Sequence, residues 1–250
     1  MQCRKCGGDM KMTELGTYKC KYCGFEEAGV MPTPVTAGRT GDVGADLYED
    51  VVGSVLQIRW YINTPTGRSI CSGSGYLITE DGYAVTNTHV VVGEDYKAAS
   101  ELEIIVNDQQ VKAKVICLGD NKGGDGKGED LAIIKLDKVP KGAKPVAFEN
   151  YDKVKNGQKI YILGNPAGMG MSITSGIVSD RLRDVYGKPR MLTDCTVNGG
   201  NSGGPVFNEA GNVIGTVVAK LSNREAMNLV IPNPVVIDFL NKNKQRFNRA

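Results

Sequence analysis

Long hydrophobic runs and an excess of charge of one sign are both missing from this sequence of 250 residues. No apolar stretch approaches the ~18–20 residues that a membrane-spanning helix needs, and the N-terminus lacks the apolar core of a secretory signal. The 30 basic and 28 acidic residues leave a net charge of only +2, which excludes a role built on bulk charge. We therefore expect a cytoplasmic protein that binds neither membranes nor nucleic acids.

Helical periodicity is scarce as well. From residue 54 to residue 232, short apolar runs recur about every ten residues, a spacing typical of a β-sandwich or β-barrels rather than βαβ units. Only residues 233–247 carry a helical pattern, in which Asn233 can cap the helix and Pro234 suits its first turn. The sequence therefore predicts a mostly β protein that ends in one helix.

Composition divides the chain into three parts. Residues 1–30 hold four clustered cysteines and few large aliphatic side chains, so this segment needs a cross-link such as a bound metal ion to fold. Residues 31–45 carry prolines, glycines and threonines without periodicity, which indicates a linker. Residues 46–250 contain the β-rich part and form the main domain.

The four clustered cysteines have the spacing of a structural zinc site. Two residues separate Cys3 from Cys6 and Cys20 from Cys23, and glycine follows the second cysteine of each pair. Four thiolates around one Zn²⁺ ion form a closed tetrahedral site, and metal binding stabilises so short a segment. The stretch resembles a zinc ribbon, with rubredoxin-type iron or a redox dithiol pair as alternatives. We expect the ribbon to bind a protein partner.

Histidine is the scarcest of the catalytic residue types. Because His89 is the only one, any imidazole base must be this residue. Ser202 lies in a glycine-rich run, where the N–H groups of Gly200 and Ser202 can point together at a developing oxyanion. Asp130 opens an apolar run, and a buried carboxylate there needs a partner such as histidine. Taken singly, these residues are equally explained as ordinary turn or core positions.

Together, the order His-Asp-Ser in the motifs THV, DLAIIKL and GNSGGP resembles the chymotrypsin-like serine proteases. Further stretches are similar to the HtrA/Deg branch of that family, at residues 72–91, 163–179, 193–219 and 228–240. The resemblance covers about residues 46–245. It implies a polypeptide-cleaving enzyme without a catalytic cofactor.

The resemblance also implies a chymotrypsin-like fold of two β-barrels with the site between them. We expect the first barrel at about 46–140, the second at about 145–232 and the C-terminal helix at 234–248. The base and the acid would come from the first barrel and the nucleophile from the second. The PDZ domain common among HtrA proteins is not expected.

By this resemblance, Ser202 attacks the peptide carbonyl, His89 carries the proton, and Asp130 orients the ring. Asp120 and Asp125 compete for the acid role, but they lie in a glycine-rich loop that offers no rigid strand. The N–H groups of Gly200 and Ser202 would form the oxyanion hole.

The resemblance places the substrate beside the segment before the nucleophile and along a later strand. The expected substrate-binding residues are Thr196, Val197, Asn198, Thr216, Val217, Val218 and Ala219. No acidic residue stands at the expected pocket floor, so we expect cleavage after small or medium aliphatic residues. Cys195 is expected to be a small buried core residue.

These expectations combine into a serine endopeptidase for intracellular protein processing or quality control, with one structural Zn²⁺ ion. Two alternatives stay open. One is a ribbon-led binding or scaffold protein whose protease domain is latent or inactive, and the other is a zinc- or redox-responsive regulator. A homo-oligomer also stays open, because no residue decides it.

Overall fold

The computed structural model describes residues 42–64, 67–93, 97–120, 129–220 and 228–247, together with three short N-terminal strands. Those strands form one antiparallel sheet in the order β1-β2-β3, with bounds Met10–Met12, Thr17–Cys20 and Glu26–Ala28. Cys20 ends β2, whereas Cys3, Cys6 and Cys23 lie outside the described residues. The predicted zinc ribbon therefore stays a prediction.

Six antiparallel strands close the first barrel, in the order β4-β5-β6-β9-β8-β7. Their alternating or continuous apolar side chains line the interior, as in β7, where every second residue is buried. The bounds are Val55–Thr64 for β4, Gly67–Leu77 for β5, Tyr83–Thr86 for β6, Leu102–Val106 for β7, Gln109–Leu118 for β8 and Ala132–Leu136 for β9.

The second barrel is a sheet in the order β15-β14-β11-β12-β13-β16 that the pairing of β15 with β16 closes. The short strand β10, Ala147–Phe148, pairs in parallel with Asn212 and Val213 of β15. The other bounds are Lys159–Gly164 for β11, Ser172–Val185 for β12, Lys188–Thr193 for β13, Pro205–Asn208 for β14, Asn212–Lys220 for β15 and Asn228–Pro232 for β16. The mostly β, double-barrel prediction is confirmed.

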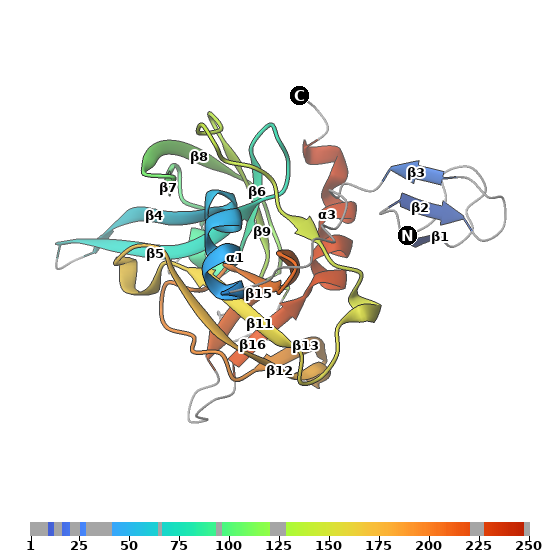
Figure 1. The fold of residues 1–250 in the computed structure, drawn as a ribbon. Helices are drawn as coiled ribbons and strands as arrows, with labels where there is room; N and C mark the ends of the chain where they lie inside the picture. The colour runs from blue at the N-terminus through green and yellow to red at the C-terminus, as the bar shows by residue number, and fades with distance from the viewer. Residues whose placement is uncertain are drawn as a thin grey trace.

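The C-terminal helix α3, Asn233–Phe247, matches its predicted bounds to within one residue. Figure 1 shows it beside the barrels, where it packs against β15 and β16 and reaches β8 of the first barrel. A helix therefore ties the two barrels together. No described helix combines the length and the apolar character needed to cross a bilayer.

Two further helices correct the prediction of a single one. Helix α1, Val43–Val51, begins inside the predicted linker, because Asp42 caps it by accepting hydrogen bonds from the N–H groups of Gly44 and Ala45. Helix α2, Thr88–Val91, is a single turn that follows β6 inside the β-rich part of the chain. Short 3₁₀ turns also occur at Val52–Ser54, Tyr151–Lys153 and Pro166–Gly168.

One apolar cluster runs through both barrels and holds them together. It includes Tyr76 of β5 and Phe148 of β10, whose ring centroids lie 6.1 Å apart, and Leu240 of α3. The Tyr76 hydroxyl also bonds Thr216 Oγ1 of β15 at 2.7 Å. A site between the barrels is therefore built on a shared core.

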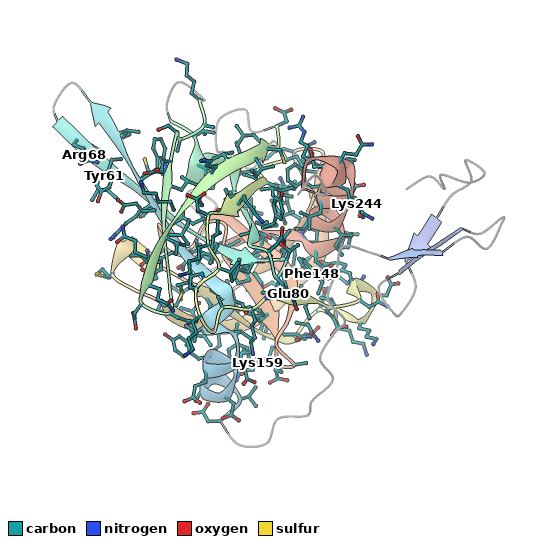
Figure 2. All side chains as sticks on the ribbon, turned by 90° about the horizontal axis from the view of Figure 1, so that it is seen from above. Tyr61, Arg68, Glu80, Phe148, Lys159 and Lys244 are labelled. Carbon is teal, nitrogen blue, oxygen red and sulfur yellow. The ribbon has the colours of Figure 1, made fainter. Side chains whose placement is uncertain are left out.

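The hairpin of β4 and β5 extends beyond the barrel, because β7 pairs only with Gln57–Arg59 of β4. Figure 2 shows Tyr61 and Arg68 near its outer end, where the Arg68 guanidinium lies 3.8 Å from the Tyr61 ring centroid. This cation–π contact joins the two strands where no other described strand pairs with them.

Candidate active site

Asp130 and His89 meet at the edge of the first barrel. Asp130 precedes β9, its side chain is fully buried, and its Oδ2 lies 2.6 Å from His89 Nδ1. Its Oδ1 accepts a second hydrogen bond, 3.0 Å long, from the backbone N–H of His89. One carboxylate thus fixes both the ring and the backbone of the histidine, and leaves Nε2 as the ring nitrogen for other chemistry.

The chain around these residues is fastened by side chains that sequence reasoning missed. Asn87 Nδ2 donates to Asp130 O at 2.7 Å, and Thr88 Oγ1 donates to Leu131 O at 2.7 Å. Both bonds join the short helix α2 to the start of β9. In the motif TNTHV, Asn87 and Thr88 therefore fix the backbone next to His89 by hydrogen bonds, while the His89 side chain remains 29% exposed.

The loop that carries Ser202, the expected nucleophile, is called the nucleophile loop below, and it contains a type II turn. The N–H of Asn201 donates to the carbonyl of Asn198 at 3.0 Å, and Gly200 at the third position has φ +99°. A positive φ at that position defines type II and favours glycine. Among the described residues, no hydrogen bond uses the N–H of Gly200 or of Ser202. Both predicted oxyanion donors are therefore available.

The same loop docks directly onto the first barrel. Gly203 has φ +82°, and a Cβ there would collide with Ser74 O of β5 and Thr86 Oγ1 of β6. The N–H of Ser74 donates to Ser202 O at 2.8 Å. A Cβ on Gly73 would touch both Ser202 O and the side chain of Val90, the residue after His89. The loop of Ser202 and the helix of His89 are thus neighbours.

The Ser202 hydroxyl itself donates to Val218 O at 3.0 Å. No hydrogen bond joins it to the His89 ring among the described residues. Hydrogen bonds between catalytic groups are often long in the absence of substrate, so the bond to Val218 O is compatible with the expected role of Ser202.

Asp130 is also placed better than its two competitors for the acid role. Asp120 is exposed, and Asp125 lies outside the described residues. Asp130 alone among the described aspartates bonds to the His89 ring.

The residues expected to bind substrate fall into two groups. Thr196 and Asn198 are exposed and Val197 is buried, in the segment that leads to the nucleophile loop. Thr216, Val217 and Val218 are fully buried, and the side chain of Ala219 is outside the described residues.

Strand β15 can therefore meet a substrate only through its backbone. The Val217 N–H and carbonyl already bond to Gly204 O and to the Gly203 N–H, and Thr216 pairs with strands on both sides. The carbonyl of Val218 accepts the hydrogen bond of the Ser202 hydroxyl. The side chains of Thr216 and Val217 belong to the core, and the expected place of this strand beside the substrate backbone stays a prediction.

Cys195 is fully buried, as expected for a core residue. Burial raises the pKa of its thiol to about 11, so the thiol stays neutral near pH 7. Its carbonyl accepts a 2.6 Å hydrogen bond from Asn228 Nδ2, which ties the start of β16 to the segment before the nucleophile. Sequence reasoning did not find Asn228.

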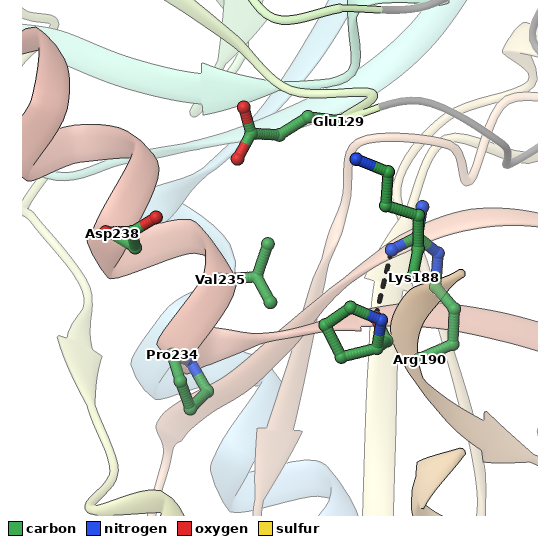
Figure 3. A pocket seen from close by; sticks show the side chains of 7 residues that line it. Glu129, Lys188, Arg190, Pro234, Val235 and Asp238 are labelled. Carbon is green, nitrogen blue, oxygen red and sulfur yellow. Dashed lines mark hydrogen bonds between the residues drawn. The ribbon is translucent and has the colours of Figure 1, made fainter. Parts of the chain in front are cut away.

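A cavity of about 290 Å³ adjoins Asp130 through its neighbour Glu129. Figure 3 shows Glu129, Lys188, Arg190 and Asp238 around it, with Pro234 and Val235 at the start of α3. The Arg190 side chain is almost fully buried, and this burial lowers its pKa while the charges of Asp130 and Glu129 oppose the shift. A buried cation of the second barrel thus lies within electrostatic range of Asp130 and Glu129.

Residues 73–215 match the family model of the trypsin-like peptidase domain. The chain therefore belongs to the trypsin-like peptidase family, which confirms the predicted resemblance to trypsin-like proteases. A probable periplasmic serine endoprotease DegP-like of Rhizobium meliloti is 40% identical over 159 residues, 62% of this chain and 29% of that protein. One of the same name from Halomonas elongata is 37% identical over 174 residues, 66% of this chain and 34% of that protein.

Among solved structures, the HtrA-type protease AlgW with decapeptide has a TM-score of 0.67 and 23% identity, covering 80% of this chain and 67% of that chain. This likeness supports the fold. The chain spans about a third of the length of the curated relatives that it matches.

One expectation is wrong on these findings. The relatives are named periplasmic, which contradicts the expected cytoplasmic location and the intracellular role that rested on it. The expectation came from the missing apolar core at the N-terminus of the sequence.

Proposed function

We propose that this chain hydrolyses peptide bonds through an acyl-enzyme formed on Ser202. The observation that carries the proposal is the fully buried Asp130 carboxylate that bonds to both Nδ1 and the backbone N–H of His89. A buried carboxylate with this geometry orients an imidazole and stabilises its charged form. The relatives named serine endoproteases support the same reaction class.

The residues divide the reaction between them. Ser202 Oγ attacks the peptide carbonyl carbon while His89 Nε2 accepts the hydroxyl proton, and Asp130 stabilises the resulting imidazolium. The carbonyl oxygen becomes an oxyanion that accepts hydrogen bonds from the N–H groups of Gly200 and Ser202. The C–N bond then breaks as His89 returns the proton to the leaving amine, and water releases the acyl group by the reverse sequence.

A latent protease domain is the second candidate, and one observation favours it. The Ser202 hydroxyl donates to Val218 O rather than to His89. The type II turn at Gly200 favours the active candidate, because the oxyanion donors are already available without substrate. In the latent case, Ser202 would react only after a partner or ligand reorganises the loop.

Labelling with a fluorophosphonate probe separates these candidates. We expect covalent labelling of the wild-type chain, none in Ser202→Ala, and at least a ~100-fold slower reaction in His89→Ala. Hydrolysis of casein should be fastest with the wild-type chain, at least ~100-fold slower in His89→Ala and absent in Ser202→Ala. A wild-type chain that is folded but neither labelled nor able to cleave casein would contradict the proposal of an active enzyme.

For the substrate we propose polypeptides cleaved after small or medium aliphatic residues. Thr196, Val197 and Asn198 carry no charge, and Cys195 behind them is a neutral thiol. A peptide library should therefore show little cleavage after lysine, arginine, aspartate or glutamate. A profile dominated by any of these four residues would overturn the assignment.

We also propose that Cys3, Cys6, Cys20 and Cys23 bind one structural Zn²⁺ ion. The donor set supports this, because two CxxC pairs supply the four thiolates that Zn²⁺ prefers. When bound, the ion would stabilise the N-terminal segment, which we propose docks a protein partner. Elemental analysis should give one zinc per chain and none in Cys3→Ser/Cys6→Ser, whereas iron would identify the rubredoxin-type alternative.

A further inference from the structure

Ser74 occupies the contact between the two barrels behind the nucleophile loop. It belongs to β5 of the first barrel, and its side chain is fully buried. Its hydroxyl donates to Gly200 O at 2.7 Å, and its backbone N–H donates to Ser202 O at 2.8 Å. One residue of the first barrel therefore holds two carbonyl groups of the loop that the second barrel supplies.

The direction of the hydroxyl bond is fixed by a third contact. Ser74 Oγ accepts a 2.9 Å hydrogen bond from the backbone N–H of Asn165. A hydroxyl has a single proton to donate, so with Asn165 as its donor the proton of Ser74 goes to Gly200 O. Because Ser74 is fully buried, both bonds are stronger than they would be at the surface.

We propose that Ser74 is a positioning residue for the oxyanion hole, a role that rests on the function proposed above. Its hydroxyl holds the C=O end of the peptide between Gly200 and Asn201, and the turn bond to Asn198 O holds the N–H end of the same peptide. With both ends held, Gly200 keeps φ +99° and its N–H stays available to the oxyanion. Without the hydroxyl, the loop gains the freedom to flip the peptide that carries this N–H.

The backbone of Ser74 supports the same role. Thr86 Oγ1 donates to Ser74 O at 2.6 Å, and Gly203 packs so closely on these two oxygens that a side chain would collide with them. The strand that carries the hydroxyl is thus held against the loop, and the position of the hydroxyl follows from the packing.

Ser74→Ala tests the proposal by kinetics with a peptide substrate and a peptide boronate. The tetrahedral boronate adduct on Ser202 places an oxygen in the oxyanion hole, so its affinity reports that hole directly. Loss of one oxyanion donor lowers kcat by about 10²–10³-fold, and we expect a misplaced donor to lower it by about 10–100-fold. The inhibition constant of the boronate should rise by the same factor as kcat/KM falls, with KM changed less than about threefold.

Ser54→Ala is the matched control, because it removes another buried serine hydroxyl at the start of β4. It should lower stability while leaving kcat and boronate affinity unchanged. Ser74→Cys, which keeps the side-chain shape with a larger and weakly donating atom, should give an intermediate kcat and serves if the alanine variant does not fold.

A folded Ser74→Ala or Ser74→Cys variant with wild-type kcat and boronate affinity would overturn the positioning role. An equal loss in Ser54→Ala would also overturn it, because the effect would then follow stability alone. Failure of the proposed function looks different: the wild-type chain itself would not turn over the peptide.

Discussion

The hydrogen bond between Tyr76 and Thr216 offers a quantitative test of how the two barrels are joined. Both side chains are fully buried, and their oxygens lie 2.7 Å apart across the barrel interface. In Tyr76→Phe, Thr216 Oγ1 loses this partner at a fully buried position, which costs about 1–3 kcal/mol. For a domain of this size, that loss corresponds to a fall in Tm of about 2–12 °C.

The double variant Tyr76→Phe/Thr216→Val gives the matched control. Replacing both partners by apolar groups of the same shape is nearly neutral, so the double variant should recover most of the stability that the single variant loses. The resulting coupling energy should be about 1–2 kcal/mol, within the range seen for residues in contact.

Urea unfolding followed by the fluorescence of Trp60 measures all four proteins of this cycle. Trp60 is the single tryptophan, is buried in the first barrel, and donates from Nε1 to Val90 O at 2.8 Å. A Tyr76→Phe variant as stable as wild type would refute the reasoning. A double variant whose loss equals the sum of the two single losses would refute it as well.

Alkaline pH provides a second readout of the same residue. Burial raises the pKa of Tyr76 above its ordinary value of 10.0, so the folded state binds the phenol proton more tightly than the unfolded state does. The resulting stabilisation is fully present below about pH 10 and is lost as the pH rises above it. Tyr76→Phe should therefore lose less stability than wild type between pH 10 and pH 11 in the same urea assay.

Three further substitutions test the site. Gly203→Ala should lower the free energy of unfolding by roughly 2–6 kcal/mol in urea melts, because positive φ and overpacking both oppose a side chain there; a loss under about 1 kcal/mol would contradict the docking of the loop. Asp130→Asn should lower kcat by about 10⁴-fold, since an amide favours the wrong imidazole tautomer; wild-type kcat would exclude Asp130 as orienter. Gly199→Pro should raise stability by about 0.4–1 kcal/mol with kcat retained, because proline suits the second position of a type II turn and Gly199 has open space around it; a loss of kcat would place the turn in another conformation.

Short apolar runs predicted the strands, whereas the two barrels and the candidate triad came from the resemblance to the chymotrypsin-like proteases. Short apolar runs with regular turns report strand burial directly, and His89, Asp130 and Ser202 belong to motifs whose residue types have few other uses together. Helix α1 was not predicted, because only Leu47 and Val51 are buried in it. Its cap Asp42 also stands among glycines and threonines that indicate a linker. Two apolar residues are too few to show a helical period.

What the sequence did not reveal depends on contacts between segments far apart in the chain. Ser74 lies 126 residues from Gly200, and neither position changes its local pattern because the other is present. The same holds for Arg190, which local reasoning assigns to an ordinary strand but which lies buried near the carboxylate of Asp130. Local pattern thus identifies the groups that carry out chemistry, since these must be particular residue types. The groups that hold them can be any residue with a hydroxyl, an amide or a charge at the right place, so only the fold reveals them.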